Sequence, residues 1–207
     1  EVQDLRWGTA EVEDREEMLE ISQRVHRIPV SERRISKQDR PILSGKITYI
    51  DGKSDLFSLG GELLYRNSVS HSKNSLFDLC CAVTMLEKQV YTVENLADFF
   101  VPENNVVLIS EQNRASISPG NIEALRQKIA GGAAVEAAEL DYAIRSRGMA
   151  KYVISVKKLD EPGGWLFLSV YGNDYNEVYD VQSGKGMVLS LSCDLLPFCQ
   201  KLMGKLE

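Results

Sequence analysis

Apolar side chains recur at helical spacing between residues 75 and 90, and this segment predicts the main buried helix of the fold. One stripe along the segment consists of Leu76, Leu79, Cys80, Val83, Leu86 and Val90, and a second consists of Phe77, Cys81 and Met85. Because apolar residues cover so much of its surface, we expect this helix to be central and buried.

A more polar helix is predicted near the N-terminus. Thr9 can cap a helix that starts near Ala10, and Pro29 would end or kink it. Its apolar positions form one narrow stripe of Met18, Ile21 and Val25. A stripe this narrow cannot hold an isolated helix in water, so it must lie on the domain's own body, lie on a partner, or be disordered.

Further helices are indicated by their start and stop signals. Thr92 caps a short helix that Pro102 ends, and Ser118-Pro119 starts a longer one. Gly131-Gly132 interrupts that helix, and a second piece runs from Ala133 to Arg147. Asp194 is the predicted cap of a final helix.

The predicted strands are joined by short turns. Residues 46–50 and 56–65 form a hairpin around Asp51-Gly52, a strong turn signal, and residues 105–110 form a continuous apolar strand. Four further strands follow within residues 151–192, and their short connections favour antiparallel pairing. We therefore predict an α+β fold: an antiparallel sheet, made of the C-terminal four-strand meander and the earlier hairpin, with helices packed on one face and an N-terminal helical arm.

Charge divides the chain at about residue 45. Residues 11–20 hold six carboxylates against one arginine, whereas residues 24–40 hold six basic residues against two acidic ones. We predict a charged N-terminal helix and linker arm over residues 1–45, followed by a single α+β domain over residues 46–207. The first interpretation of the arm is a solvated, charge-balanced helix; the second is a docking element for a partner.

The 207-residue composition excludes several classes of function. A net charge of −6 and a pI near 5.1 argue against a general binder of nucleic acid or of anionic membranes. No apolar run reaches the roughly 20 residues of a membrane span. The four cysteines form no C-x-x-C pair and no signal segment is present, which indicates reduced, structural thiols and a cytoplasmic protein. We expect no cofactor and no metal.

Few residues suggest chemistry. Asp174, Asn176, Glu177 and Asp180 begin like a calcium loop but lack the later glycine and the closing glutamate, so a turn is favoured over a metal site. Gly184-Lys185-Gly186 lacks the third glycine of a dinucleotide-binding loop. Cys80 lies on an apolar stripe, where a thiol would be protonated and inert.

The sequence therefore favours a non-enzymatic protein-binding or interaction module that acts through a partner protein, which would be another protein or a second copy of the chain. The polarised arm supplies the candidate contact residues, which are Met18, Ile21, Arg24, Val25, Arg27, Arg33 and Arg34. An antiparallel pairing of two such arms would place acidic on basic segments. The alternative is an enzyme, a hydrolase or transferase, whose site is assembled from distant residues near His71, Asp174 and Asn176.

Overall fold

The computed structural model describes residues 1–4, 6–28, 30–31, 43–59, 63–65, 68–70, 76–135, 137–159, 164–172, 174–181 and 186–204. It divides into two compact units, Glu1–Tyr91 and Thr92–Glu207, each with its own antiparallel sheet. The fold is α+β, as predicted. The predicted single sheet is two sheets, because the hairpin after residue 43 pairs within the first unit and the C-terminal meander within the second.

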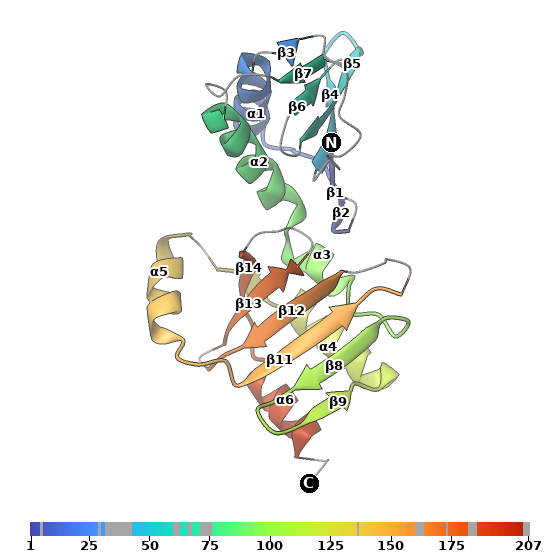
Figure 1. The fold of residues 1–207 in the computed structure, drawn as a ribbon, viewed down its shortest axis with the longest axis vertical. Helices are drawn as coiled ribbons and strands as arrows, with labels where there is room; N and C mark the ends of the chain where they lie inside the picture. The colour runs from blue at the N-terminus through green and yellow to red at the C-terminus, as the bar shows by residue number, and fades with distance from the viewer. Residues whose placement is uncertain are drawn as a thin grey trace. The chain divides into compact units, whose positions relative to one another are not determined.

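The sheet of the first unit is built from short antiparallel strands in the order β2-β1-β4-β5-β6-β7-β3 (Figure 1). Its strands, as far as the structure describes them, are β1 (Val2–Asp4), β2 (Gly8–Ala10), β3 (Val30–Ser31), β4 (Leu43–Thr48), β5 (Ser54–Leu59), β6 (Leu63–Tyr65) and β7 (Ser68–Ser70). The N-terminal strand β1 pairs with β4, so the sheet joins segments about 40 residues apart in sequence.

The predicted hairpin turn at Asp51-Gly52 is confirmed. Gly52 has a φ of +81°, a conformation that glycine adopts at no steric cost. The Tyr49 amide donates to the Lys53 carbonyl at 2.8 Å, and the Lys53 amide donates to Asp51 Oδ1 at 3.0 Å. The turn therefore closes β4 onto β5 by local hydrogen bonds alone, which explains why the sequence indicated it.

Helix α1 (Arg15–Arg27) begins later than predicted. Thr9 is not its cap, because the backbone of Thr9 is paired with Gln3 between β2 and β1. Asp14 caps the helix instead, and its Oδ1 accepts a 2.8 Å hydrogen bond from the Glu17 amide. Asp is as good a cap as Thr, so the choice between them is made by the strand pairing that occupies Thr9.

Helix α2 (Leu76–Val90) is amphipathic rather than buried on all sides, which corrects the prediction from its two stripes. Ala82, Leu86 and Val90 are buried, whereas Phe77 is 70 % exposed and Cys80 is exposed. The side chains of Leu76 and Leu79 lie outside the described residues. The reason is that α2 packs against α1 and the β1 and β4 side of the sheet with one face only.

The described parts of the predicted arm are integral to the first unit. Val2 and Leu43 are buried in the paired strands β1 and β4, and α1 packs against α2. Trp7 is also buried and meets the ring of Tyr91 edge-on, with the centroids 4.9 Å apart. The compact units meet in sequence after Tyr91, and not at residue 45, because these long-range contacts tie the N-terminus to α2.

The second unit holds the predicted four-strand meander as the centre of a sheet with the order β10-β14-β13-β12-β11-β8-β9. Its described strands are β8 (Asn105–Ile109), β9 (Arg114–Ser116), β10 (Ala133–Ala134), β11 (Tyr152–Lys157), β12 (Trp165–Val170), β13 (Tyr175–Asp180) and β14 (Met187–Ser192). Its described helices are α3 (Val93–Ala97), α4 (Pro119–Ala130), α5 (Ala137–Ser146) and α6 (Leu196–Met203).

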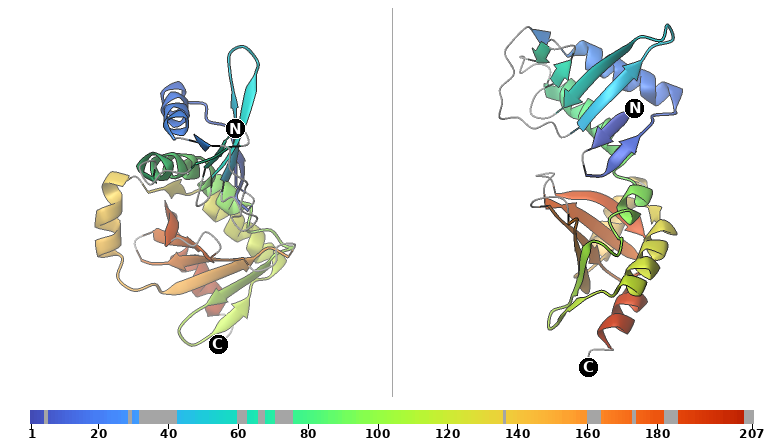
Figure 2. Two further views of the ribbon diagram at one scale, coloured as in Figure 1. Left: turned by 45° about the horizontal axis from the view of Figure 1, so that its top comes forward. Right: turned by 90° about the vertical axis from the view of Figure 1, so that its right-hand side faces the viewer.

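Helices α3, α4 and α6 cover one face of this sheet (Figures 1 and 2). The core between them is fully buried and includes Leu125 and Ile129 of α4 with Ile154, Leu166 and Leu168 of the sheet. The alternate residues Trp165, Phe167 and Ser169 of β12 are half-buried on the opposite face, which we call the open face. The prediction that helices pack on one face therefore holds for α3, α4 and α6, whereas α5 lies over the open face, where it lines a cavity with Tyr175 and Ser192.

The start of α3 agrees with the prediction, whereas the starts of α5 and α6 differ from it. Thr92 caps α3 as expected, with its Oγ1 accepting from the Asn95 amide at 3.2 Å. However, Ala133–Ala134 forms strand β10 on the edge of β14, so α5 starts at Ala137. The N-cap of α6 is Leu195, and no side chain caps it, because Asp194 lies one residue too early.

Candidate functional site

Glu177 is the centre of a buried polar cluster on the open face of the second sheet. Its carboxylate is 0 % exposed and accepts hydrogen bonds from the hydroxyls of Tyr171, Tyr175 and Tyr179 at 2.8, 2.9 and 2.5 Å. The guanidinium of Arg147 forms an ion pair with Oε1 of the same carboxylate. We call these five residues the Glu177 cluster.

The strand period explains how the cluster forms. Tyr175, Glu177 and Tyr179 occupy alternate positions of β13, so their side chains project from the same face of the sheet. Tyr171 lies just before the turn into β13. Arg147 follows α5 and lies over the Tyr171 ring, with its guanidinium carbon 5.1 Å from the ring centroid. Only the three cluster members on β13 follow a regular spacing in the sequence.

The cluster fills all the hydrogen-bond acceptor positions of the Glu177 carboxylate. An ionised carboxylate offers about four lone-pair positions, and the three hydroxyls and the guanidinium of the cluster fill them. Removing a carboxylate from water is costly unless it is paired and hydrogen-bonded, and here it is both. Glu177 is thus held as a structural anion, with no acceptor capacity left to take a proton from a substrate.

Burial also changes the pKa of two tyrosines of the cluster. It raises the pKa of Tyr175 and of Tyr179, since the apolar surroundings penalise the phenolate; the positive charge of Arg147 opposes the shift in part. Both hydroxyls are therefore neutral at physiological pH and act as hydrogen-bond donors to Glu177.

A pH titration tests this arrangement. The unfolded chain releases tyrosine protons above pH ~10, while the folded chain keeps those of Tyr175 and Tyr179. Their contribution to stability is therefore complete below pH ~10 and is lost as pH rises through the higher folded pKa. We expect Tyr175→Phe/Tyr179→Phe to lose stability less steeply than wild type between pH ~10 and ~12 in urea unfolding. Tyr142→Phe, at an exposed position, is the control. Equal slopes for the wild type and the double variant would contradict the assignment.

A cavity of about 600 Å³ lies between α5 and the β13–β14 part of the open face, and we call it the α5 cavity. Ala138, Tyr142 and Ala143 line it from α5, and Tyr175 and Ser192 line it from the sheet. Arg147 also lines the cavity, so two members of the Glu177 cluster, Tyr175 and Arg147, form part of its wall. A concave site with a few convergent polar groups and perturbed pKa values is the usual form of a ligand site.

Of the three residues of the alternative enzyme site, the structure describes Asp174 and Asn176. Asn176 projects from β13 on the side opposite Glu177, and its Nδ2 donates to the carbonyls of Cys193 and Asp174 at 2.9 and 3.1 Å. Asp174 is exposed and adopts a φ of +59°, as Asp does in turns. His71 lies outside the described residues. Among the described residues, no group of three or more His, Cys, Asp or Glu side chains is arranged to hold a metal ion.

The candidate partner residues divide between the interior and the surface of the first unit. Ile21 and Val25 are buried within the unit, whereas Met18 is 46 % exposed. Arg24 lies between Glu20 and Asp78, at 3.1 Å from each, and these hydrogen bonds raise its pKa. Arg27 is exposed. Arg33 and Arg34 lie outside the described residues, so the structure brings together only the α1 part of the predicted set.

A groove of about 360 Å³ runs beside α1 in the first unit. Met18 and Ile21 line it together with Phe57 of β5 and Leu86 of α2, and Lys46 of β4 also contributes to its wall. Leu19, the neighbour of Met18, is 58 % exposed and is absent from the predicted contact residues. The sequence did carry a signal for Leu19, because it lies three residues after Glu16 and four before Gln23, on the same polar side of the predicted helix.

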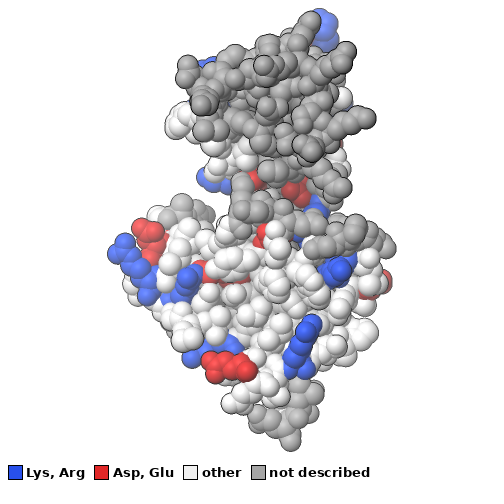
Figure 3. Space-filling view, in the orientation of Figure 1, with Lys and Arg blue, Asp and Glu red and all other residues white. Residues whose placement is uncertain are grey.

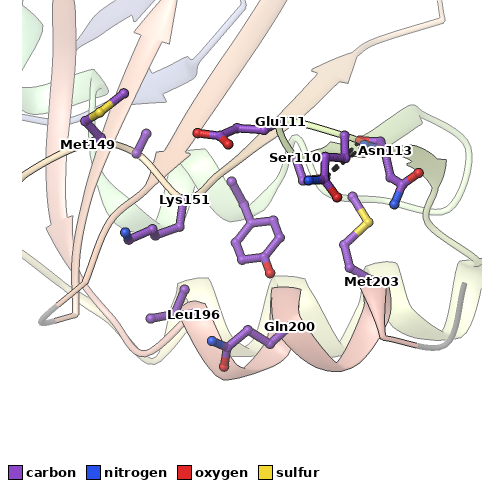
Figure 4. Close-up of a pocket in the computed structure, with 11 residues that line it drawn as sticks. Ser110, Glu111, Asn113, Met149, Lys151, Leu196, Gln200 and Met203 are labelled. Atoms are coloured by element: carbon purple, nitrogen blue, oxygen red, sulfur yellow. Dashed lines mark hydrogen bonds between the residues drawn. The ribbon is translucent and has the colours of Figure 1, made fainter. Parts of the chain in front are cut away.

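A third hollow, of about 430 Å³, lies at another edge of the second sheet (Figure 4). Figure 4 shows Lys151, Gln200 and Met203 around it, with Ser110 and Asn113 joined by a hydrogen bond. Its charged lining residues, Glu111 and Lys151, are both exposed. Without a buried polar group among these described residues, this hollow offers less to orient a ligand than the α5 cavity does.

The cysteines differ in accessibility. Cys80 is exposed, Cys81 and Cys193 are half-buried and Cys199 is buried, and each is a free thiol in the structure. Burial raises the pKa of Cys193 and of Cys199 to about 12. Because the thiolate is the reactive form, both are poor nucleophiles at neutral pH.

Thiol titration tests this difference. We expect Cys80 to react first with Ellman's reagent at pH 8, and Cys193 and Cys199 to react only on unfolding. Cys80→Ser should remove the fast phase. Denatured protein that has not been reduced should titrate four thiols. A fast phase that includes Cys199, or a total of two thiols, would contradict the prediction.

Comparison with known proteins gives a family but no activity. The residue pattern of DUF3919, described as a protein of unknown function, matches residues 1–200. The chain belongs to the DUF3919 family. No curated protein matches the sequence. A crystal structure of a candidate lipoprotein from Clostridium perfringens is similar over 55 % of this chain and 94 % of its own, with 17 % identity and a TM-score of 0.39.

One further property of this DUF3919 chain concerns membranes. Among the residues that the structure describes, no helix combines the length and the apolar character that a bilayer crossing requires.

Proposed function

We propose that this protein is a non-enzymatic interaction module that acts through another protein chain, and that the outward face of α1 is its docking surface. The occupant that we propose is a second copy of the chain. The observation that supports the proposal is the composition of this face, on which Glu16, Leu19, Gln23 and Arg27 follow one another at helical spacing and are all exposed. We call these four residues the α1 face.

Apolar exposure distinguishes the α1 face from an ordinary solvated helix surface. Leu19 is 58 % exposed near its middle, and the half-exposed Met18 borders it on the side of the groove. The opposite side of the helix already buries Ile21 and Val25 in the first unit, so it supplies the rigid support that a docking helix needs. Apolar residues on a supported, outward helix face favour packing against another helix.

Charge favours a second copy as the occupant. The first turn of α1 is acidic, with Glu16 and Glu17, and its last turn is basic, with Arg24, His26 and Arg27. When two such helices pack antiparallel about a two-fold axis, Glu16 of each copy lies opposite Arg27 of the other, and Leu19 lies near the axis. Opposite charges at both ends then fix the antiparallel orientation.

The small apolar area implies a weak dimer. Leu19 and Met18 are the large apolar side chains of the described α1 that are exposed, and exposed ion pairs contribute little each. We therefore expect sedimentation experiments at protein concentrations up to roughly 1 mM to show a concentration-dependent monomer–dimer equilibrium. A dissociation constant of roughly 1 mM corresponds to an association free energy of about −4 kcal/mol. Added salt should weaken the dimer.

A charge-reversal experiment tests the arrangement. Glu16→Arg and Arg27→Glu should each abolish the dimer, because each places like charges together at both ends of the pair. The double variant Glu16→Arg/Arg27→Glu should restore it. Leu19→Asp should also abolish it, while Ile50→Asp, at the fully exposed tip of the β4–β5 hairpin, is the matched control and should not. A wild-type chain that stays monomeric up to roughly 1 mM, or a double variant without rescue, would overturn the proposal.

A further inference from the structure

We infer that the α5 cavity binds a neutral, polyhydroxylated ligand, of the chemical class of a mono- or disaccharide. The site lies in the second unit, and its ligand is a small molecule, so it is independent of the proposed docking face on α1. The inference follows from the juxtaposition of aromatic walls, a pinned arginine and, among the described residues, a charge balance that disfavours anions around one cavity.

The size and walls of the cavity suit a small polar molecule with apolar faces. Its volume of about 600 Å³ falls within the range typical of small-molecule sites. Tyr142 of α5 and Tyr175 of β13 contribute aromatic surface, while Ala138 and Ala143 keep the helix side shallow. Tyrosine combines a flat apolar ring with a polar tip, which matches the C–H faces and hydroxyl groups of a sugar ring.

Arg147 supplies hydrogen-bond donors in a fixed position. Its guanidinium carries five N–H groups, and Nη1 is the group that pairs with Glu177. The Arg147 side chain is 28 % exposed and lines the cavity, whereas Glu177 is fully buried behind it. The ion pair and the contact with the Tyr171 ring hold the guanidinium in place, so its outward N–H groups are preorganised for hydroxyl oxygens.

The charges of the described residues at the site argue against an anionic ligand. The positive charge of Arg147 is balanced by Glu177, and Glu139 on the α5 wall adds a negative charge. These three charges of the described residues sum to −1, which disfavours a carboxylate or phosphate. Figure 3 shows mostly uncharged side chains on the visible face of this unit, with scattered charged side chains among them.

Aromatic side chains continue from the cavity across the open face. Tyr179 of the cluster lies beside Phe167 in the β13–β12 pairing, and Phe167 stacks with Trp165 at a centroid distance of 6.4 Å. All three are half-buried and therefore retain accessible ring surface. This strip would allow a second sugar ring to extend from the cavity along β12.

Saturation-transfer NMR and calorimetry with defined sugars test the inference. The neutral probes are cellobiose, maltose, lactose and N-acetylglucosamine; glucuronate is the anionic probe and glucosamine the cationic one. We expect at least one neutral probe to bind the full chain more tightly than either charged probe. Tyr142→Ala removes an exposed aromatic wall, and Ala143→Leu fills the cavity. Each should weaken that binding about tenfold or more.

The same sugar probes are used with a control variant, and they define the results that would overturn the inference. Leu159→Ala changes an exposed apolar residue of the second unit outside this cavity and should bind like wild type. Circular dichroism spectra that match the wild type show that the variants are folded. The inference is overturned if no neutral probe binds at roughly 10 mM, if glucuronate or glucosamine binds more tightly, or if Tyr142→Ala and Ala143→Leu bind like wild type.

Discussion

Replacing Glu177 with glutamine should lower the free energy of unfolding by about 3–5 kcal/mol, because it breaks a buried ion pair on one side only. The amide matches the carboxylate in shape, so the change isolates the charge. It leaves the guanidinium of Arg147 without its anion, and it places an N–H₂ group against hydroxyls that now donate to the carboxylate. Chemical unfolding followed by tryptophan fluorescence measures the loss.

Two further variants distinguish the ion pair from simple side-chain volume. Ser169→Ala alters the β12 residue that pairs with Glu177 on the same face, and it should change the stability by less than about 0.5 kcal/mol. Arg147→Met in the Glu177→Gln background should recover part of the loss, since it removes the unpaired cation. A loss below about 1 kcal/mol for Glu177→Gln would show that the cluster does not hold the open face together.

Leu86→Ala should destabilise the first unit by about 2–5 kcal/mol. Leu86 is 2 % exposed, and it lies on the face of α2 that packs against α1 and the first sheet. The change removes buried methyl groups and leaves a cavity that rigid strands fill only in part. Urea unfolding monitored by circular dichroism measures the effect.

The control for this substitution lies on the same helix. Thr84 is exposed, two residues before Leu86, and Thr84→Ala should change the stability by less than about 0.5 kcal/mol. If Leu86→Ala costs less than about 0.5 kcal/mol, then α2 is peripheral to its unit, and the packing of the first unit rests on other residues.

Much of the secondary structure could be predicted because its signals are local. The Asp51-Gly52 turn and the Thr92 cap act through neighbouring backbone groups, and Pro119 in the first turn of α4 restricts its own backbone, although the Ser118 side chain makes no cap hydrogen bond. The meander followed from alternation and short turns, which leave antiparallel pairing as the simple outcome. Where two equally good caps competed, as with Thr9 and Asp14, the sequence could not decide, because the answer depends on pairing with a distant strand.

The candidate site was only partly visible in the sequence. Glu177 belonged to a polar run that suggested a calcium loop, but its actual partners are Tyr175 and Tyr179 at alternate positions of the same strand. That period-two pattern was a usable signal. The sequence held no such signal for Arg147 and Tyr171, because they reach Glu177 from outside β13. Only the folded chain brings them to the open face of the sheet.

By itself the sequence determined the α+β class, the four-strand meander, the narrow apolar stripe of α1 and the existence of helix α2. The tertiary structure decided which faces of those helices are buried, since α1 and α2 cover each other's apolar stripes and leave Leu19 and Phe77 outside. It also decided that the strands form two sheets, because β1 pairs with β4 within a unit that closes at Tyr91. Periodicity records which side of an element is apolar, whereas the choice of partner depends on contacts between residues far apart in the chain.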